Sequence, residues 1–303
     1  MFCKPKALFA LSALAISVWS APLFAAEDFT SLSEKQRTLL KTFVDEFVDV
    51  TPGKGKFPAS FMMGSSDGPA SERPPTKITF GHSFSIAKYE IPQNLYEAVM
   101  GNNPSRWTGP RNSAEMFDFA TVQKFCQKIT QQLRAAKLLG DDEEVRLPTE
   151  AEWEYCCRAG TTTPYSFGQD GEKKGDDGKP VKTRDGKPVR ILDDFGWHTG
   201  NASGNDPPVG ALKPNAWGLY DMHGYLWEFV ADDWHDSHQG AHPDGSARHS
   251  KDQKSSPVVR GGSWMETYDL LSSSARRTVP ADFKRADLGF RCVRAKVRKQ
   301  AKR

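Results

Sequence analysis

Aromatic side chains are spread along this chain among turns rather than gathered in long periodic segments. Its 303 residues include eight Trp, eighteen Phe and seven Tyr, together with 25 Gly and 20 Pro. Glycine and proline interrupt regular elements, so short strands and loops must carry much of the aromatic burial. The pattern predicts an irregular mixed fold with many loops.

Three segments depart from this texture and predict helices. A helical period of apolar residues runs through residues 33–50, ahead of the main domain, and another runs through residues 117–139. The third begins after Thr149, which forms a capping box with Glu152, and is expected to cover residues 150–157. Short alternating apolar runs elsewhere predict short strands.

Residues 170–194 form a charged, glycine-rich stretch. The sequence Asp-Gly-Lys-Pro-Val occurs in it twice, at residues 177–181 and 185–189. Such repeats predict two turns of a surface hairpin or loop. The functional alternative is a contact with a protein partner.

The first 26 residues have the features of a secretory signal peptide. Lys4 and Lys6 precede an apolar run at residues 7–19, and Ala25 and Ala26 offer small residues for cleavage. That run is too short to span a bilayer, and no later stretch approaches about 20 apolar residues. We therefore expect an exported protein without a membrane span. The expected divisions are a signal peptide at 1–26, an N-terminal helix at 27–56, a main domain at 57–295 and a basic tail at 296–303.

The charge balance excludes a nucleic-acid binder. A net charge of +3 over 303 residues creates no broad basic field. Basic residues gather only in the tail, which we interpret as a solvated terminus rather than a binding site.

Four cysteines lie outside the leader, namely Cys126, Cys156, Cys157 and Cys292. Export permits disulfides, and four cysteines allow three pairings, among which spacing does not choose. The adjacent pair Cys156 and Cys157 lacks the second pair that zinc sites use.

The segment Arg260-Gly-Gly-Ser-Trp-Met-Glu266 is the strongest candidate for a site. Two glycines before an aromatic residue indicate close backbone packing or positive φ. Glu266 follows this turn, and the next basic residue after it is Arg276. A carboxylate placed by a rigid turn can serve in acid–base catalysis, and the alternative is a solvated loop charge. Dinucleotide fingerprints, a Ser-His-Asp order and histidines at metal-ligand spacing are missing from the sequence.

Six segments of the chain occur in the order typical of the formylglycine-generating enzyme, or sulfatase-modifying factor, family. They are Phe61-Met-Met-Gly-Ser65, residues 90–107, Arg146-Leu-Pro-Thr-Glu-Ala-Glu-Trp-Glu-Tyr155, residues 214–228, Arg260-Gly-Gly-Ser-Trp264 and Leu288-Gly-Phe-Arg-Cys292. The chain resembles this family over about residues 57–295. The resemblance implies an irregular α+β fold related to C-type lectins, with little regular secondary structure, but a fold alone does not give a function.

The chain departs from the family at its copper ligands. Members that generate formylglycine hold copper(I) with two cysteines after the Gly-Gly-Ser turn, whereas residues 265–280 contain no cysteine here. Glu266 stands where the first cysteine is expected, and a hard carboxylate oxygen binds copper(I) poorly. We therefore expect no copper and no copper-dependent formylglycine formation.

The resemblance also implies two structural features. It pairs Cys126 with Cys292 in a disulfide, and it leaves Cys156 and Cys157 either free and buried or joined as a vicinal pair. It further implies a calcium ion bound partly by Glu228, next to Tyr225 where the family has Asn. The alternative is that Glu228 is a buried acid bonded to backbone or to an arginine.

One branch of the family fits these departures. The chain is similar to periplasmic proteins of pyoverdine siderophore maturation, which lack the cysteine pair and act in oxidation of the fluorophore. The resemblance implies a periplasmic enzyme, a siderophore precursor as substrate and molecular oxygen as co-substrate. It makes Glu266 the general base, with Trp264, Tyr268 and the pair Arg276 and Arg277 shaping the pocket. The rival hypothesis is a non-catalytic exported binding module of the same lectin-like fold.

Overall fold

The computed structural model describes residues 32–202, 204, 206–250 and 256–297. The expected signal peptide and most of the basic tail lie outside the described residues. Within the described part of the chain, no helix is long and apolar enough to cross a membrane.

Short elements make up the chain, as the spread of turn residues predicts. The α-helices are α1 (Glu34–Asp45), α2 (Gln93–Met100), α3 (Phe119–Ala135) and α4 (Glu150–Arg158), and the 3-10 helices are η2 (Ala70–Glu72), η3 (Leu192–Asp194) and η4 (Tyr268–Leu271). The strands are β1 (Phe47–Val50), β2 (Phe61–Met63), β3 (Thr76–Ile78), β4 (Phe84–Ala87), β5 (Glu143–Arg146), β6 (Trp227–Asp233), β7 (Pro257–Arg260), β8 (Arg276–Thr278), β9 (Leu288–Gly289) and β10 (Val293–Lys296).

Two small four-stranded sheets carry the fold. The first has the strand order β1-β4-β10-β5 and the second β8-β7-β6-β9, while β2 and β3 form a separate hairpin. Only the pairing of β6 with β9 is parallel among the named strands. The arrangement confirms the expected α+β fold with little regular secondary structure.

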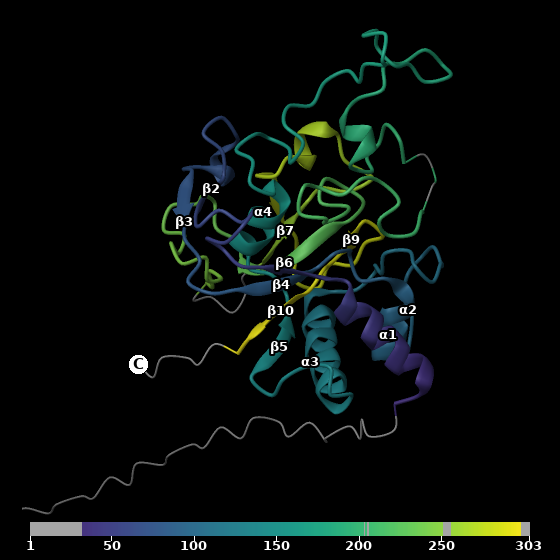
Figure 1. The fold of residues 1–303 in the computed structure, drawn as a ribbon, viewed down its shortest axis with the longest axis vertical. Helices are drawn as coiled ribbons and strands as arrows, with labels where there is room; N and C mark the ends of the chain where they lie inside the picture. The colour runs from purple at the N-terminus through teal and green to yellow at the C-terminus, as the bar shows by residue number, and fades with distance from the viewer. Residues whose placement is uncertain (1–31, 203, 205, 251–255, 298–303) are drawn as a thin grey trace, which may run out of the picture.

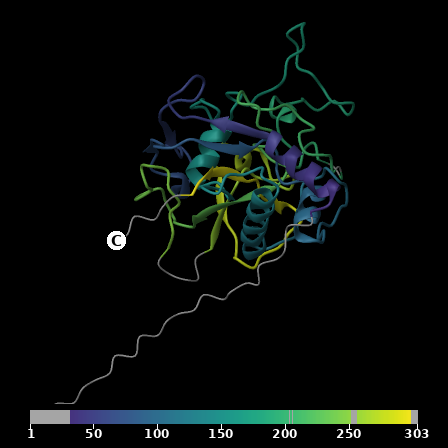
Figure 2. The ribbon, with the colours of Figure 1, turned by 60° about the horizontal axis from the view of Figure 1, so that its bottom comes forward.

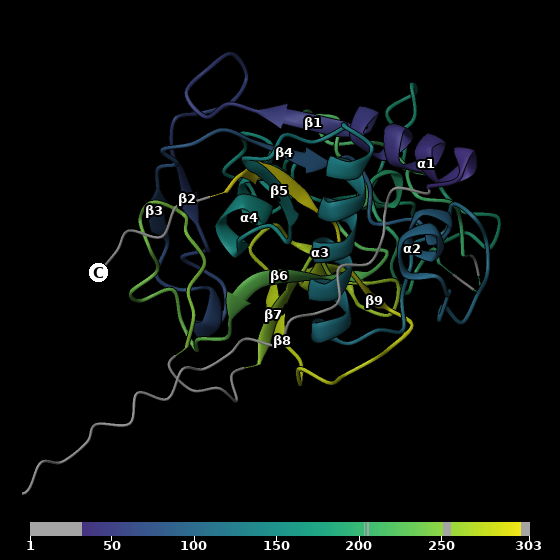
Figure 3. The ribbon, with the colours of Figure 1, turned by 90° about the horizontal axis from the view of Figure 1, so that it is seen from below.

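Helices α1, α2 and α3 lie together at one end of the molecule (Figures 1 and 3). Their shared core contains stacked aromatic rings, with Tyr96 and Phe125 at 5.6 Å between ring centroids and Phe290 edge-on to Phe125 at 5.1 Å. Such offset and edge-on pairs add to the free energy gained from burial of the rings. The long helix of the sequence analysis is therefore confirmed as α3, which ends four residues earlier than expected.

The first helix is shorter than the sequence predicts. The apolar period of residues 33–50 continues past the end of α1 at Asp45, but Phe47–Val50 forms β1 instead. This strand pairs antiparallel with β4, so sheet hydrogen bonds replace the helical ones. Residues 47–50 thus share a sheet with the region after residue 57.

Residues 170–194 project from the opposite end of the molecule as an arm (Figures 1 and 2). Three of its backbone amides form a closed ring of hydrogen bonds. Val181 N donates to Lys173 O, Val189 N donates to Val181 O, and Lys173 N donates to Val189 O. The two Asp-Gly-Lys-Pro-Val copies supply the turns between these segments, which confirms the expected double-turn surface loop.

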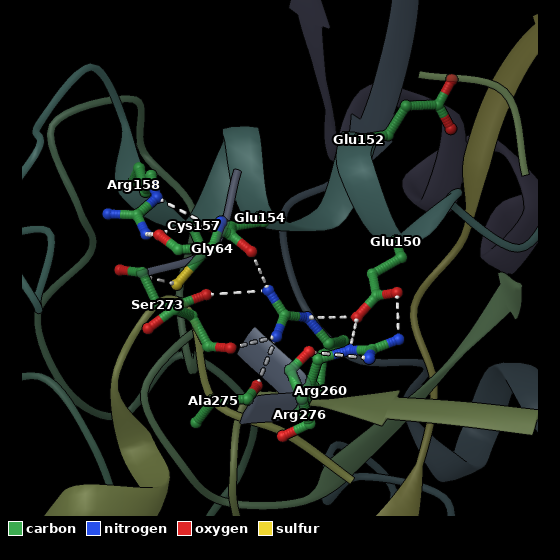
Figure 4. Close-up of polar contacts among 12 residues, drawn as sticks. Gly64, Glu150, Glu152, Glu154, Cys157, Arg158, Arg260, Ser273, Ala275 and Arg276 are labelled. Atoms are coloured by element: carbon green, nitrogen blue, oxygen red, sulfur yellow. Dashed lines mark hydrogen bonds and ion pairs between the residues drawn. The ribbon is translucent and has the colours of Figure 1, made fainter. Parts of the chain in front are cut away.

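Helix α4 positions the rest of the fold through three buried glutamates, Glu150, Glu152 and Glu154, none more than 3% exposed. Its capping box between Thr149 and Glu152 is present, as predicted. Each glutamate is ion-paired to arginine from a different part of the chain, because residues two apart on a helix point in different directions. Figure 4 shows the three glutamates.

Arg260 is the most deeply buried of the arginines that α4 binds. It is fully buried, forms a short ion pair with Glu154 and donates to the backbone oxygens of Ser273, Ser274 and Ala275 (Figure 4). Arg158 also donates to Glu154, at 2.8 Å. A buried charge of this kind is tolerated only when it is paired and hydrogen-bonded.

A Glu152→Gln variant tests how much this pairing stabilises the fold. Burial alone would raise the pKa of Glu152, but the Arg146 guanidinium at 2.7 Å lowers it to about 2. The carboxylate therefore stabilises the folded state above pH 4.5, and this contribution is lost as the pH falls towards 2. We expect the variant to lose about 3 kcal/mol at pH 7 in urea unfolding, since Gln keeps the capping box but not the charge.

The difference between variant and wild type should shrink as the pH is lowered from 4.5. Glu97→Gln, at an exposed position of α2, is the matched control and should cost little at any pH. A Glu152→Gln deficit that stays constant between pH 7 and pH 3 would contradict the role of the charge.

Candidate active site

The two glycines after β7 place the candidate site. Gly261 and Gly262 have φ of 95° and 75°, in the left-handed region that side chains disfavour. A Cβ on Gly262 would come within 2.5 Å of the Leu270 backbone oxygen. The turn then closes with Glu266 N donating to Ser263 O at 3.0 Å. Glycine is therefore required here by both backbone angle and space.

The Glu266 carboxylate is held by two donors at one oxygen. Arg277 Nη1 donates to Oε1 at 2.6 Å, and the Trp227 indole Nε1 donates to the same atom at 3.1 Å. The side chain is 12% exposed, and its second oxygen, Oε2, accepts no hydrogen bond from the described residues. Thr199 fixes the backbone by donating to Glu266 O. A fixed carboxylate with one uncommitted oxygen is the arrangement that proton transfer needs.

The expected pair Arg276 and Arg277 is divided between two environments. Both belong to β8, where successive side chains point to opposite faces. Arg277 faces Glu266, whereas Arg276 points inward and forms a bidentate ion pair with Glu150 at 2.6 and 2.8 Å. Arg276 therefore belongs to the buried network of α4 rather than to the pocket.

Trp264 and Tyr268 both lie on the loop that carries Glu266, but they face different neighbours. Trp264 packs edge-on against Trp107 at 5.6 Å, and its Nε1 donates to Ala286 O. Tyr268 is 37% exposed and packs against His198 and Arg190. The two rings border the loop on separate sides rather than enclosing the carboxylate.

Phe290 lies in the aromatic core under α3. The structure supplies two neighbours of the site that the sequence analysis missed, Trp227 and Arg285. Trp227 belongs to one of the six family segments, and this membership was the sequence signal that could have indicated its role. Arg285 lies in an irregular loop, where no periodicity predicts the direction of a side chain.

The donor set does not fit the family's copper centre. Glu266 and the buried Leu271 occupy the site loop, and the four described cysteines lie elsewhere and are buried. No group of three or more His, Cys, Asp or Glu among the described residues could hold a metal ion.

Glu228 has both carboxylate oxygens engaged. Arg291 Nε and Nη2 donate to them at 2.7 Å each, and Trp153 Nε1 donates at 2.9 Å. All three side chains are buried. The neighbouring Tyr225 has φ of 99° and donates its hydroxyl to Asp206. A guanidinium thus occupies the position of a counter-cation, an arrangement that does not fit calcium at Glu228.

His223 and His238 are buried. His238 is 2% exposed, and burial lowers its pKa. His223 is also buried, which lowers its pKa to about 4, and its ring accepts from Ser166 N at 3.1 Å. Neither imidazole reaches the Glu266 carboxylate through a hydrogen bond.

Cys156 and Cys157 are free and buried, as one of the two alternatives predicts. Burial raises the pKa of Cys157 to about 12, so the thiol is unreactive. Cys126 and Cys292 face each other in the core with their Sγ atoms 3.9 Å apart, as two thiols. The predicted disulfide between them therefore remains a prediction.

We expect protein matured in an oxidising compartment to carry two free thiols, at Cys156 and Cys157. Facing side chains in contact favour a Cys126–Cys292 bond once an oxidant is present. Thiol titration under denaturing, non-reducing conditions measures the number, and peptide mass mapping locates the bond. A Cys126→Ser variant should then show two thiols from Cys156 and Cys157 and a third from Cys292. Four free thiols in the wild-type protein would contradict the pairing.

Calcium and EDTA are expected to leave the midpoint of thermal unfolding unchanged. A bound ion would stabilise the folded state by mass action, whereas the Arg291 pair at Glu228 is independent of calcium concentration. The measurement compares the midpoint of thermal unfolding in about 1 mM calcium with the midpoint in EDTA. A calcium-dependent rise that Glu228→Gln abolishes would overturn this interpretation.

Comparisons with known proteins agree with the order of motifs. The profile of the sulfatase-modifying factor enzyme 1-like domain matches residues 36–296. The formylglycine-generating enzyme of Mycobacterium tuberculosis is 34% identical over 49% of this chain and 50% of its own length. The chain thus spans about half the length of that relative, and less of the mouse and bovine enzymes.

Two further proteins are similar over more of their length. PvdO from Pseudomonas aeruginosa has a solved structure with a TM-score of 0.63 and 28% identity, covering 79% of this chain and 92% of that one. Chaperone protein LppX from Paenibacillus barcinonensis is 26% identical over 70% of this chain and 80% of its own.

Proposed function

This chain belongs to the sulfatase-modifying factor family, and within it we propose that it oxidises a dihydro precursor of a pyoverdine-type siderophore chromophore, with Glu266 as the general base. The observation that carries the proposal is the Glu266 carboxylate, held at Oε1 by Arg277 and Trp227 with Oε2 uncommitted. It stands where the resemblance puts the first copper ligand. Similarity to PvdO over 92% of that chain supports the same branch.

The ion pair suits Glu266 to act as a base. An ion pair along one edge of the carboxylate leaves the other oxygen open to accept a proton. The indole and guanidinium donors also fix the direction of the side chain, so that Oε2 is presented without rearrangement. Trp227 and Arg277 are therefore positioning residues for Glu266.

The proposed reaction balances with molecular oxygen as the oxidant. The catechol ring of the precursor gives two electrons and two protons to oxygen, which forms hydrogen peroxide and an ortho-quinone. Glu266 then removes a proton from a saturated carbon of the neighbouring ring, a second proton leaves the adjacent atom of that ring, and both quinone oxygens are protonated. The catechol is restored and a new ring double bond remains, so the substrate has lost two hydrogens overall.

Export to the periplasm is part of this proposal. The apolar run at residues 7–19 with its basic start supports it from the sequence. The oxidising compartment would also supply the oxygen and favour the Cys126–Cys292 disulfide.

Replacing Glu266 by Gln should reduce formation of the fluorescent product by about 100-fold or more, because an amide cannot accept the proton. The assay follows fluorescence of a purified dihydropyoverdine-type precursor in air. Asp269→Asn, an exposed acid on the same loop, is the matched control and should keep near-normal turnover. Near-normal turnover by Glu266→Gln would sink the proposal.

A copper(I) chelator tests whether the proposed oxidation depends on copper. Turnover by the wild-type protein should survive bathocuproine, since the site loop offers no thiolate. Loss of activity that added copper restores would assign the oxidation to copper instead.

The second candidate is a non-catalytic exported binding module. Similarity to the chaperone protein LppX over 80% of that chain favours it. A wild-type protein that binds the precursor without accelerating its oxidation in air would support this candidate over the first.

A further inference from the structure

A pocket of about 220 Å³ is lined in part by Trp227 and Arg277, the two residues that hold Glu266. Its apolar wall is formed by Trp227, Val279, Pro280, Phe283 and Leu288, and its polar lining by Arg277, Thr278, Arg285 and Asp287. This volume fits one substituted aromatic ring rather than a whole siderophore. The pocket therefore suits the reacting end of a larger molecule.

Two guanidinium groups face this pocket, each fixed on one side by an aromatic ring. Arg277 lies over Trp227 at 5.2 Å, and Arg285 lies over Phe283 at 5.8 Å from the ring centroid. Their side chains are 42% and 41% exposed, so both remain open to a ligand. Stacking of this kind fixes a guanidinium plane without using its N–H donors.

Each guanidinium is hydrogen-bonded to a carboxylate through some of its N–H donors, and the others are left over. Arg277 contributes Nη1 to Glu266, while Arg285 contributes Nε and Nη2 to the two oxygens of Asp287. Asp287 is itself buried and accepts from the Ser263 hydroxyl at 2.9 Å, which ties Arg285 to the Gly-Gly-Ser turn. Arg285 Nη1 and Arg277 Nη2 make no hydrogen bond to the described residues. They are the donors that a ligand can use.

These features assign a chemical class to the ligand. Fixed N–H donors on two cations favour an anionic oxygen, since charge-assisted hydrogen bonds are stronger than neutral ones. The apolar walls and the narrow volume favour a flat ring. Arg277 and Trp227 line the pocket and also contact Glu266, so a ring seated in the pocket is one side chain away from the general base.

We propose that this pocket is the subsite for the ionised catechol ring of the substrate, and that Arg285 is a binding residue that determines its specificity. The identity of the substrate rests on the proposed function, whereas the preference for an aryl oxyanion rests on the pocket itself. Binding to Arg277 and Arg285 holds the ring as the catecholate, the form that loses electrons to oxygen most readily.

Binding of 4-nitrocatechol tests the subsite without turnover, because the colour of this probe reports its ionisation. Wild-type protein is expected to bind it with an absorbance shift towards the ionised form. Arg285→Gln should weaken binding about ten-fold and reduce the shift, since one charge-assisted contact is lost. Gln still donates to Asp287, and Arg285→Lys provides a second variant that keeps the charge without the planar fork.

Arg111→Gln is the matched control. Arg111 also lies over an aromatic ring, Tyr89, and pairs with a carboxylate, Glu46, but it does not line the pocket. Its substitution should leave the dissociation constant within about two-fold of wild type. Equal binding by Arg285→Gln and wild type would overturn the subsite, as would equal affinity for the dimethyl ether of the probe, which cannot ionise.

Benzoate separates the two sources of an aryl oxyanion. Weaker binding of benzoate than of 4-nitrocatechol supports the catechol assignment, and tighter binding overturns it in favour of a carboxylate. In turnover, Arg285→Gln should raise KM, and kcat should fall in proportion to the ionised fraction of the bound ring.

The subsite and the proposed function fail separately. Glu266→Gln is expected to bind the probe while losing turnover. Probe binding lost in Arg285→Gln together with normal turnover in Glu266→Gln would remove the function and keep the subsite. Normal probe binding in Arg285→Gln together with lost turnover in Glu266→Gln would contradict the subsite and keep the proposed function.

Discussion

The buried guanidinium of Arg260 is the interaction on which the rest of this structure depends. It joins α4, through Glu154, to the backbone oxygens of residues 273–275, which run from the end of the site loop into β8. Arg260 is also the last residue of β7, directly before the two glycines of the turn that positions Glu266. One charged side chain therefore fixes both ends of the loop that carries the candidate base (Figure 4).

The ion pairs between the α4 glutamates and their arginines stabilise the fold only when every partner is in place. A buried ion pair gains little over apolar packing when complete, but loss of one partner leaves a charge without compensation. The three glutamates of α4 are each committed to arginine, so their helix, the β-strands and the site loop must form together. The same requirement explains why an irregular chain with few long elements adopts one defined arrangement: its specificity comes from paired charges more than from periodic secondary structure.

The sequence predicted the family, α3, α4 and the place of Glu266, because motifs, helical period and capping signals are local. It could not predict that Phe47–Val50 leaves the helix for a sheet, since the partner strand β4 lies far along the chain. Nor could it assign Arg276 and Arg277 to different faces before β8 was identified as a strand. Arg285 and the burial of His238 depend on loops whose course only the complete fold determines.

The closed hydrogen-bond ring makes the outer part of the 170–194 arm, residues 173–189, self-contained. The two ends of the arm meet where Ile191 N donates to Gly171 O and Arg190 pairs with Asp170. A unit that satisfies its own backbone and returns to its starting point transmits little strain to the body that carries it. The arm is therefore a natural position for inserting an affinity tag or a spectroscopic label, at Gly178 or Gly186, while the buried charge network stays intact.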